Sequence, residues 1–153
     1  MSDKRAQTYD LYLAAWSAVP DAERARMLRE SLSQDIVFKN PLQTRHGLAE
    51  VTAHLEGFQV RSPGGSFRMN NMVGWGTYAL AEWQLVDAKG DAGFSGYDVL
   101  TFDEQGLIST ILLFGNVEAQ KLRVATSRSG VAGADPVGPS SRRTQIPGPV
   151  SPN

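Results

Sequence analysis

Residues 94–115 read FSGYDVLTF (94–102), DEQG (103–106) and LISTILLFG (107–115). Two runs of β-branched and aromatic residues flank a short polar turn, which is the pattern of an antiparallel hairpin. Side chains alternate along a strand, so Asp98 shares one face with Gly96, Leu100 and Phe102. The pattern therefore predicts that Asp98 lies on the more apolar face of the hairpin.

An acid on an apolar face loses solvation, which disfavours its charged form and raises its pKa. A carboxyl group that keeps its proton can donate a hydrogen bond to an oxyanion. The alternative is a structural role, in which Asp98 binds a backbone amide or an arginine and only holds the sheet together. The position alone leaves both interpretations open.

The composition narrows the class of protein. A chain of 153 residues suits one domain, and 15 basic against 16 acidic residues leave no basic stripe for nucleic acid. The absence of cysteine excludes disulfides and thiolate chemistry. Residues 1–8 resemble no signal peptide, and no stretch approaches 18 consecutive apolar residues. We therefore expect a cytoplasmic protein that has neither nucleic-acid nor membrane partners.

The first half of the chain has helical periodicity. Apolar residues recur at intervals of three and four from about Lys4 to Val19, again from Ala22 to Ser33 after a cap at Asp21, and from Gly47 to about Val60. Between the last two helices, Gln34–Lys39 has the composition of a short strand. We therefore expect three helices in this half.

After residues 62–65 the period changes to two, which predicts strands over Ser66–Trp75 and Thr77–Val86 before the hairpin. The predicted class is α+β, with the three helices packed on one face of a curved antiparallel sheet and a cone-shaped interior suited to a small molecule. Residues 127–153 are rich in Pro, Gly and Ser, so we expect a domain over residues 1–126 and a flexible tail over 127–153.

The order of these elements resembles the nuclear transport factor 2-like superfamily, in particular its SnoaL-like polyketide cyclases and the ketosteroid isomerases. Residues 12–21 (YLAAWSAVPD) resemble the first helix of the isomerases, where a tyrosine supplies an oxyanion donor. Residues 96–102 and 106–115 resemble their last hairpin, whose aspartate is the second donor. The resemblance implies that Tyr12 and Asp98 are oxyanion donors and that the protein is a homodimer.

A third segment that resembles the isomerases differs from them at one residue. Residues 36–41 (IVFKNP) resemble the isomerase segment in which an Asp-Pro carries the general base, but position 40 is Asn, which has no proton-accepting carboxylate. Asn before Pro is also similar to the limonene epoxide hydrolases, where the Asn helps to hold the attacking water. Ala81 and Trp83 stand where their Arg and an Asp would be expected.

A catalytic site also needs a group that moves a proton. His54 shares the inward edge of its helix with Val51 and Phe58, and a neutral imidazole is a competent base near pH 7. The alternative for His54 is a core or rim histidine bonded to a backbone carbonyl. Large side chains able to line a pocket, or simply to fill the core, are Trp16, Phe38, Phe58, Met69, Trp83, Phe102 and Phe114.

The first hypothesis is a cofactor-independent acid/base enzyme, since the sequence has neither metal-ligand spacing nor a phosphate-binding glycine loop. Tyr12 and protonated Asp98 would stabilise an enolate, His54 would move the proton and Asn40 would orient substrate or water. The reaction would be an isomerisation, a cyclisation or a hydration of a small apolar carbonyl compound. The alternatives are a non-catalytic module that binds a small molecule or another protein, and an epoxide-hydrolase-like activity.

Overall fold

The computed structural model describes residues 3–116. The predicted tail over 127–153 and the end of the predicted domain, residues 117–126, lie outside the described residues. The elements in chain order are α1 (Lys4–Ala14), α2 (Asp21–Ser31), β1 (Leu32–Lys39), β2 (Thr44–His46), α3 (Gly47–Arg61), β3 (Ser66–Trp75), β4 (Tyr78–Val86), β5 (Ala92–Phe102) and β6 (Ile108–Phe114).

The predicted α+β class is confirmed, but the sheet is mixed rather than purely antiparallel. The strands lie in the order β2-β1-β6-β5-β4-β3, and every neighbouring pair is antiparallel except β1 and β6, which run parallel. The short strand β2, which the sequence pattern did not predict, extends the sheet at its β1 edge. A strand of three residues is too short to show a period of two in the sequence.

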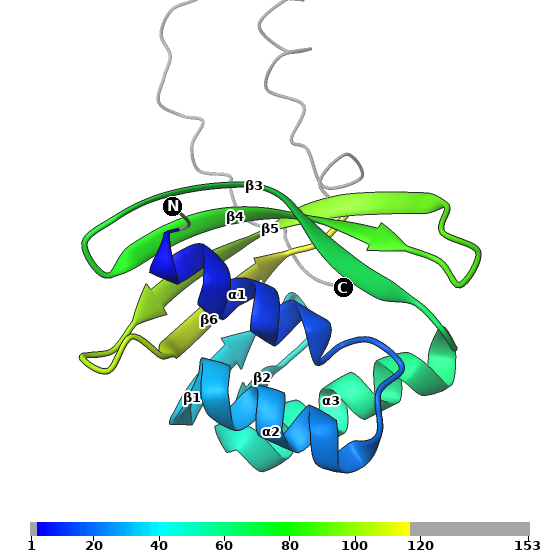
Figure 1. Cartoon of the computed structure of the whole chain (residues 1–153), viewed down its shortest axis with the longest axis horizontal. Helices are drawn as coiled ribbons and strands as arrows, with labels where there is room; N and C mark the ends of the chain where they lie inside the picture. The colour runs from blue at the N-terminus through cyan, green and yellow to red at the C-terminus, as the bar shows by residue number, and fades with distance from the viewer. Residues whose placement is uncertain (1–2, 117–153) are drawn as a thin grey trace, which may run out of the picture.

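Helix α1 lies against the sheet in the middle of the molecule, between the long strands and the α2–α3 pair (Figure 1). The core beneath the sheet combines residues of all three helices with the inward residues of the strands. Its fully or almost fully buried members include Tyr9, Tyr12, Leu28, Ile36, Phe38, Val51, Leu55, Leu100, Ile108 and Ile111. The helices therefore close one face of the sheet and isolate that face from water.

Helix α1 ends at Ala14, five residues before the predicted end at Val19. The buried side chain of Arg24 in α2 is the physical reason, because its guanidinium donates hydrogen bonds to the carbonyls of Ala15 and Ser17, both at 2.9 Å. These bonds satisfy backbone acceptors just beyond the end of α1. The predicted Asp21 cap is also wrong, since Asp21 is the first helical residue and Pro20 precedes it without a side-chain cap.

Strand β3 contains a bulge between Met69 and Asn71 that reverses the direction of the following side chains. Met69 packs on the core, as a strict alternation predicts, whereas Val73 and Trp75 are exposed to 58% and 73% on the outer face. The period of two predicted over Ser66–Trp75, which would put all odd positions on one face, therefore does not hold beyond the bulge.

Gly96 fixes how closely β4, β5 and β6 pack near the predicted site. A Cβ atom at this position would collide with the Phe114 carbonyl and with the indole ring of Trp83, its partner across β4 and β5. Because only glycine leaves that space, the Trp83 indole lies over the backbone of β5, two residues from Asp98.

Candidate functional site

Asp98 lies on the inner face of β5 and only 2% of its surface is exposed. Its cross-strand neighbours are Ala81 on β4 and Leu113 on β6, which offer no charge to the carboxyl group. Among the described residues, no arginine or lysine forms an ion pair with Asp98. The carboxyl group is therefore buried in apolar surroundings, as the alternation of the hairpin predicts.

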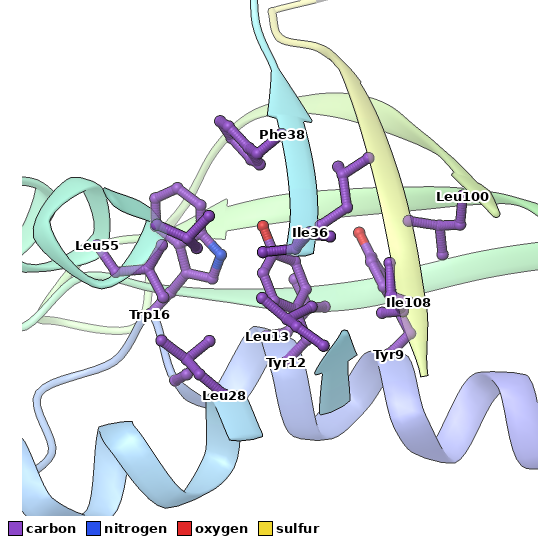
Figure 2. Packing of buried hydrophobic residues seen from close by; sticks show 14 of the residues in the cluster. Tyr9, Tyr12, Leu13, Trp16, Leu28, Ile36, Phe38, Leu55, Leu100 and Ile108 are labelled. Atoms are coloured by element: carbon purple, nitrogen blue, oxygen red, sulfur yellow. The ribbon is translucent and has the colours of Figure 1, made fainter. Parts of the chain in front are cut away.

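Two tyrosines of α1 approach the carboxyl group from the helical side. Tyr9 and Tyr12 are three residues apart and so share one helix face, with ring centroids 5.8 Å apart. Figure 2 shows both hydroxyl groups pointing away from α1 toward the strands. The Tyr9 hydroxyl donates a hydrogen bond of 2.7 Å to Oδ2 of Asp98, whereas the Tyr12 hydroxyl is buried without a partner.

Burial raises the pKa of Asp98 from 3.8 to about 7, because an apolar environment disfavours the charged carboxylate. The hydrogen bond from Tyr9 and the nearby indole N–H of Trp83 act in the opposite direction and limit the rise. Burial and the Asp98 carboxyl group raise the pKa of Tyr12 well above its usual 10, so this phenol keeps its proton. The site thus contains a carboxyl group that can hold its proton close to neutral pH.

The Tyr9 bond also distinguishes the two carboxyl oxygens. Since Oδ2 accepts from Tyr9, we assign the proton of the neutral acid to Oδ1. Oδ1, the Tyr12 hydroxyl and Nε1 of Trp83 each lack a hydrogen bond of ordinary geometry, although the three residues are at most 4% exposed and the Trp83 N–H lies near the Asp98 carboxyl group. The buried Tyr12 O–H and Trp83 N–H, and the Asp98 O–H when the acid is protonated, therefore lack a well-placed acceptor, and each such group costs about 1–3 kcal/mol of stability.

His54 lies at some distance along the aromatic core, with Trp16 between it and Tyr12. The Trp16 ring centroid is 6.3 Å from that of Tyr12 and 5.4 Å from that of His54. The Nδ1 atom of His54 lies 3.2 Å from Nη2 of Arg45, and since an arginine N–H can only donate, Nδ1 is the acceptor. Burial, Arg45 and Arg61 lower the pKa of His54 from 6.5 to about 4, so its imidazole is neutral and weakly basic.

Asn40 is part of a turn rather than of this cluster. Its Oδ1 accepts the backbone N–H groups of Leu42 and Gln43, both at 2.9 Å. This Asx turn leads the chain from β1 into β2. The structure therefore does not bring Asn40 to Asp98.

The seven side chains predicted to line a pocket divide between two faces of the sheet. Trp16, Phe38, Phe58, Trp83 and Phe102 are buried on the inner side, and Met69 packs against them. Phe114, by contrast, is 46% exposed and pairs with Tyr97, whose side chain points to the opposite face from Asp98. The expectation that Phe114 lines the interior is therefore not met, because β6 presents it outward.

Sequence reasoning missed Tyr9 as a site residue and treated it only as part of the apolar stripe of α1. The available signal was its spacing of three from Tyr12, which places two phenols on one helix face. Within residues 3–116, no cluster of three or more His, Asp or Glu side chains is arranged to hold a metal. Nor does any helix in that range have the length and apolar character needed to cross a membrane.

The chain belongs to the SnoaL-like domain family, whose model matches residues 11–111. A candidate isomerase of the SnoaL-like family from Agrobacterium tumefaciens is similar in structure, with a TM-score of 0.67, 23% sequence identity and coverage of 73% of this chain and 97% of the other. A candidate SnoaL-like polyketide cyclase from Jannaschia sp. CCS1 gives a TM-score of 0.61, 15% identity and coverage of 76% and 88%.

A nuclear transport factor 2-like protein of unknown function from Exiguobacterium sp. 255-15 gives a TM-score of 0.58, 16% identity and coverage of 71% and 97%. A search of curated proteins finds no significant match. At these identities the likeness to the solved structures establishes the fold, which is the one that the resemblance implied.

The two shifted pKa values predict opposite pH dependences of stability. The raised pKa of Asp98 stabilises the folded state fully below about pH 4, and this contribution is lost as pH rises to about 7. The lowered pKa of His54 gives a contribution that is complete above pH 6.5 and is lost as pH falls to about 4. In Asp98→Asn the free energy of unfolding should therefore rise between pH 4.5 and 6.5, and in His54→Gln it should fall.

Urea unfolding at several pH values measures both slopes, each at most about 1.4 kcal/mol per pH unit. Asp35→Asn, which removes an exposed carboxyl group from β1, should run parallel to the wild type and serves as the control. If the curve of unfolding free energy against pH for Asp98→Asn ran parallel to that of the wild type, Asp98 would be ionised in the folded protein.

Proposed function

We propose that the protein is a cofactor-independent acid/base enzyme of the isomerase, cyclase or hydratase type, acting on a small and largely apolar carbonyl compound. The observation that supports it best is the set of buried polar atoms without a hydrogen bond of ordinary geometry on Tyr12, Trp83 and Asp98. A carbonyl or enolate oxygen would supply the missing acceptor. Interactions that strengthen as negative charge develops on this oxygen lower the reaction barrier.

The two phenols and the acid take different roles in this proposal. Tyr12 donates to the substrate oxygen, and Tyr9 holds the carboxyl group of Asp98 through the bond to Oδ2. Asp98 in its neutral form donates from Oδ1 to the substrate oxygen. In its ionised form it accepts the α-proton that leaves the substrate and returns it to another carbon, because an acid with a pKa of about 7 can both accept and release a proton at neutral pH. Donors in such sites typically contribute about 2.7–4 kcal/mol each to lowering the barrier.

The predicted role of His54 as proton shuttle receives little support from its surroundings. A pKa of about 4 and an Nδ1 atom occupied by Arg45 make it a weak base at neutral pH. We therefore assign proton transfer to Asp98, and we place His54 on the wall of the site as a neutral donor through Nε2.

The second candidate is a non-catalytic module that binds a small molecule in the same interior. Two observations favour it: position 40 is Asn rather than Asp, and His54 is weakly basic. The epoxide-hydrolase-like alternative is weaker, because Oδ1 of Asn40 is already bonded to two backbone amides. Turnover, rather than binding, distinguishes the enzyme from the module.

The proposal predicts that Tyr12→Phe and Asp98→Asn weaken the binding of 2-naphthol, a phenol whose oxygen imitates an enolate. Each variant should also slow the conversion of 3-cyclohexenone to 2-cyclohexenone by about 100-fold or more. Fluorescence titration and ultraviolet absorbance measure the two effects. Tyr78→Phe, which alters an exposed tyrosine of β4, should change neither.

The same variants separate function from stability. Tyr12→Phe removes a buried hydroxyl without a partner, so its stability should equal or exceed that of the wild type, whereas Tyr9→Phe should cost about 1–3 kcal/mol. Unchanged naphthol binding in both Tyr12→Phe and Asp98→Asn would refute the site. Binding that depends on both residues, without any turnover, would favour the non-catalytic module.

We also propose that the outer face of the sheet pairs with a second copy of the chain. Val73, Leu80, Val99 and Leu112 are cross-strand neighbours in register, and they form an apolar row across four strands with exposures of 40–58%. Exposed apolar side chains gathered in one continuous patch are a feature of interaction surfaces. In a twofold dimer the same patch serves both subunits, so the row would pack against its own copy.

This dimer predicts a clear change in molar mass for Leu80→Glu, which places a charge in the middle of the row. Light scattering at micromolar concentration should give a dimer for the wild type and a monomer for the variant. Lys89→Gln, in the exposed turn after β4, changes the net charge by the same one unit and should leave the dimer intact. A monomeric wild type would rule out the pairing.

A further inference from the structure

A second group of polar side chains lies on the inner side of the sheet at its β2 edge. Arg45 on β2 is the register partner of Phe38 on β1, and residues directly opposite each other share one face of a sheet. Phe38 is fully buried in the core, so Arg45 also lies on the inner face. A permanent positive charge is thus placed beside the aromatic interior rather than on the outer surface.

The contacts of Arg45 leave its guanidinium partly unused. Nη2 donates to Nδ1 of His54, and Nε is buried without a partner. Because Nδ1 of His54 is the acceptor, the imidazole proton sits on Nε2 and is a further donor. The His54 ring lies 5.0 Å from Phe38 and 5.4 Å from Trp16, between centroids. Arginine and histidine therefore present donors next to an aromatic wall.

No acidic side chain balances this charge within residues 3–116. The four ion pairs in this range involve Arg5, Arg24 and Arg26, and none involves Arg45. Arg61 lies close enough to His54 to disfavour protonation of its imidazole. The charge of Arg61 therefore adds to the positive potential around Arg45. A partly buried cation without a counter-ion is costly for the fold. An anion supplied by a ligand would remove that cost.

We propose that Arg45 and His54 form an anion subsite that binds a carboxylate of the ligand, while the oxygen at the ligand's other end reaches Tyr12 and Asp98. The planar guanidinium matches a carboxylate in shape as well as in charge. Trp16 is in ring contact with both Tyr12 and His54 and so joins the two ends of the site. The substrate class is then an aromatic or alicyclic carbonyl compound that carries a carboxylate. This inference rests on the proposed function only for the end of the ligand that reaches Tyr12 and Asp98.

Three related probes separate the two ends: 2-naphthol with the hydroxyl alone, 2-naphthoate with the carboxylate alone, and 6-hydroxy-2-naphthoate with both. Titration of the full chain at pH 6, where most Asp98 carries its proton, gives the dissociation constants. The wild type should bind 6-hydroxy-2-naphthoate about 10- to 100-fold more tightly than 2-naphthol. Arg45→Met should abolish this preference, and Arg45→Lys should retain part of it.

Arg29→Met is the matched control, because Arg29 is exposed in the last turn of α2 and its loss changes the net charge equally. It should leave the preference unchanged. Raising the salt concentration should weaken the binding of 2-naphthoate to the wild type more than that of 2-naphthol. The salt comparison needs no variant, so it tests the subsite even if Arg45→Met is unstable.

Equal affinity of the wild type for 2-naphthol and 6-hydroxy-2-naphthoate would overturn the anion subsite and leave the proposed function standing. An equal loss of affinity for all three probes in Arg45→Met would overturn the subsite too, since that result indicates a structural role for Arg45. Arg45-dependent binding of 2-naphthoate without Asp98-dependent binding of 2-naphthol would support the subsite and refute the proposed function.

Discussion

The hydrogen bond between the Tyr9 hydroxyl and Oδ2 of Asp98 is the interaction on which the interior depends. It joins α1 to β5 across 89 positions of sequence and lies among buried apolar side chains. In such surroundings the bond satisfies one carboxyl oxygen and directs the proton to the other. The fold thereby keeps a carboxylic acid in a fixed orientation, in the same buried cluster as the second phenol of α1.

This arrangement places stability and function in opposition within one cluster. The buried donors of Tyr12, Trp83 and Asp98 would form a more stable core if they were paired or replaced by apolar groups. The rest of the core and the close packing at Gly96 hold them in place. Unpaired polar groups held by a well-packed scaffold are typical of preformed binding sites, where the ligand completes the hydrogen bonds.

The sequence was informative where the signal was local. Strand alternation correctly predicted that Asp98 faces the apolar side, and the helical periodicity located α2 and α3 to within two residues at each end. Prediction from the sequence failed where residues distant along the chain determine the local structure. The early end of α1 depends on the Arg24 side chain, the outward direction of Trp75 depends on the bulge in β3, and the parallel pairing of β1 with β6 has no local pattern.

The same distinction applies to the candidate site. Tyr12 and Asp98 were predicted together from a resemblance, and the structure brings their side chains into one cluster, while Tyr9 was missed because its partner is remote in sequence. Asn40 was chosen from a resemblance, and His54 from its position on the helix and its chemical type. Their actual partners, two backbone amides and Arg45, change what these side chains can do.

The protonation state of Asp98 is the central claim, and carbon-13 NMR of the aspartate carboxyl groups measures it directly. Comparison with Asp98→Asn assigns the resonance, and its chemical shift is then followed from pH 4 to pH 9. A titration midpoint near 7 is the expected result. A midpoint near the ordinary value of 3.8, with the shift of an ionised carboxylate throughout that range, would contradict it.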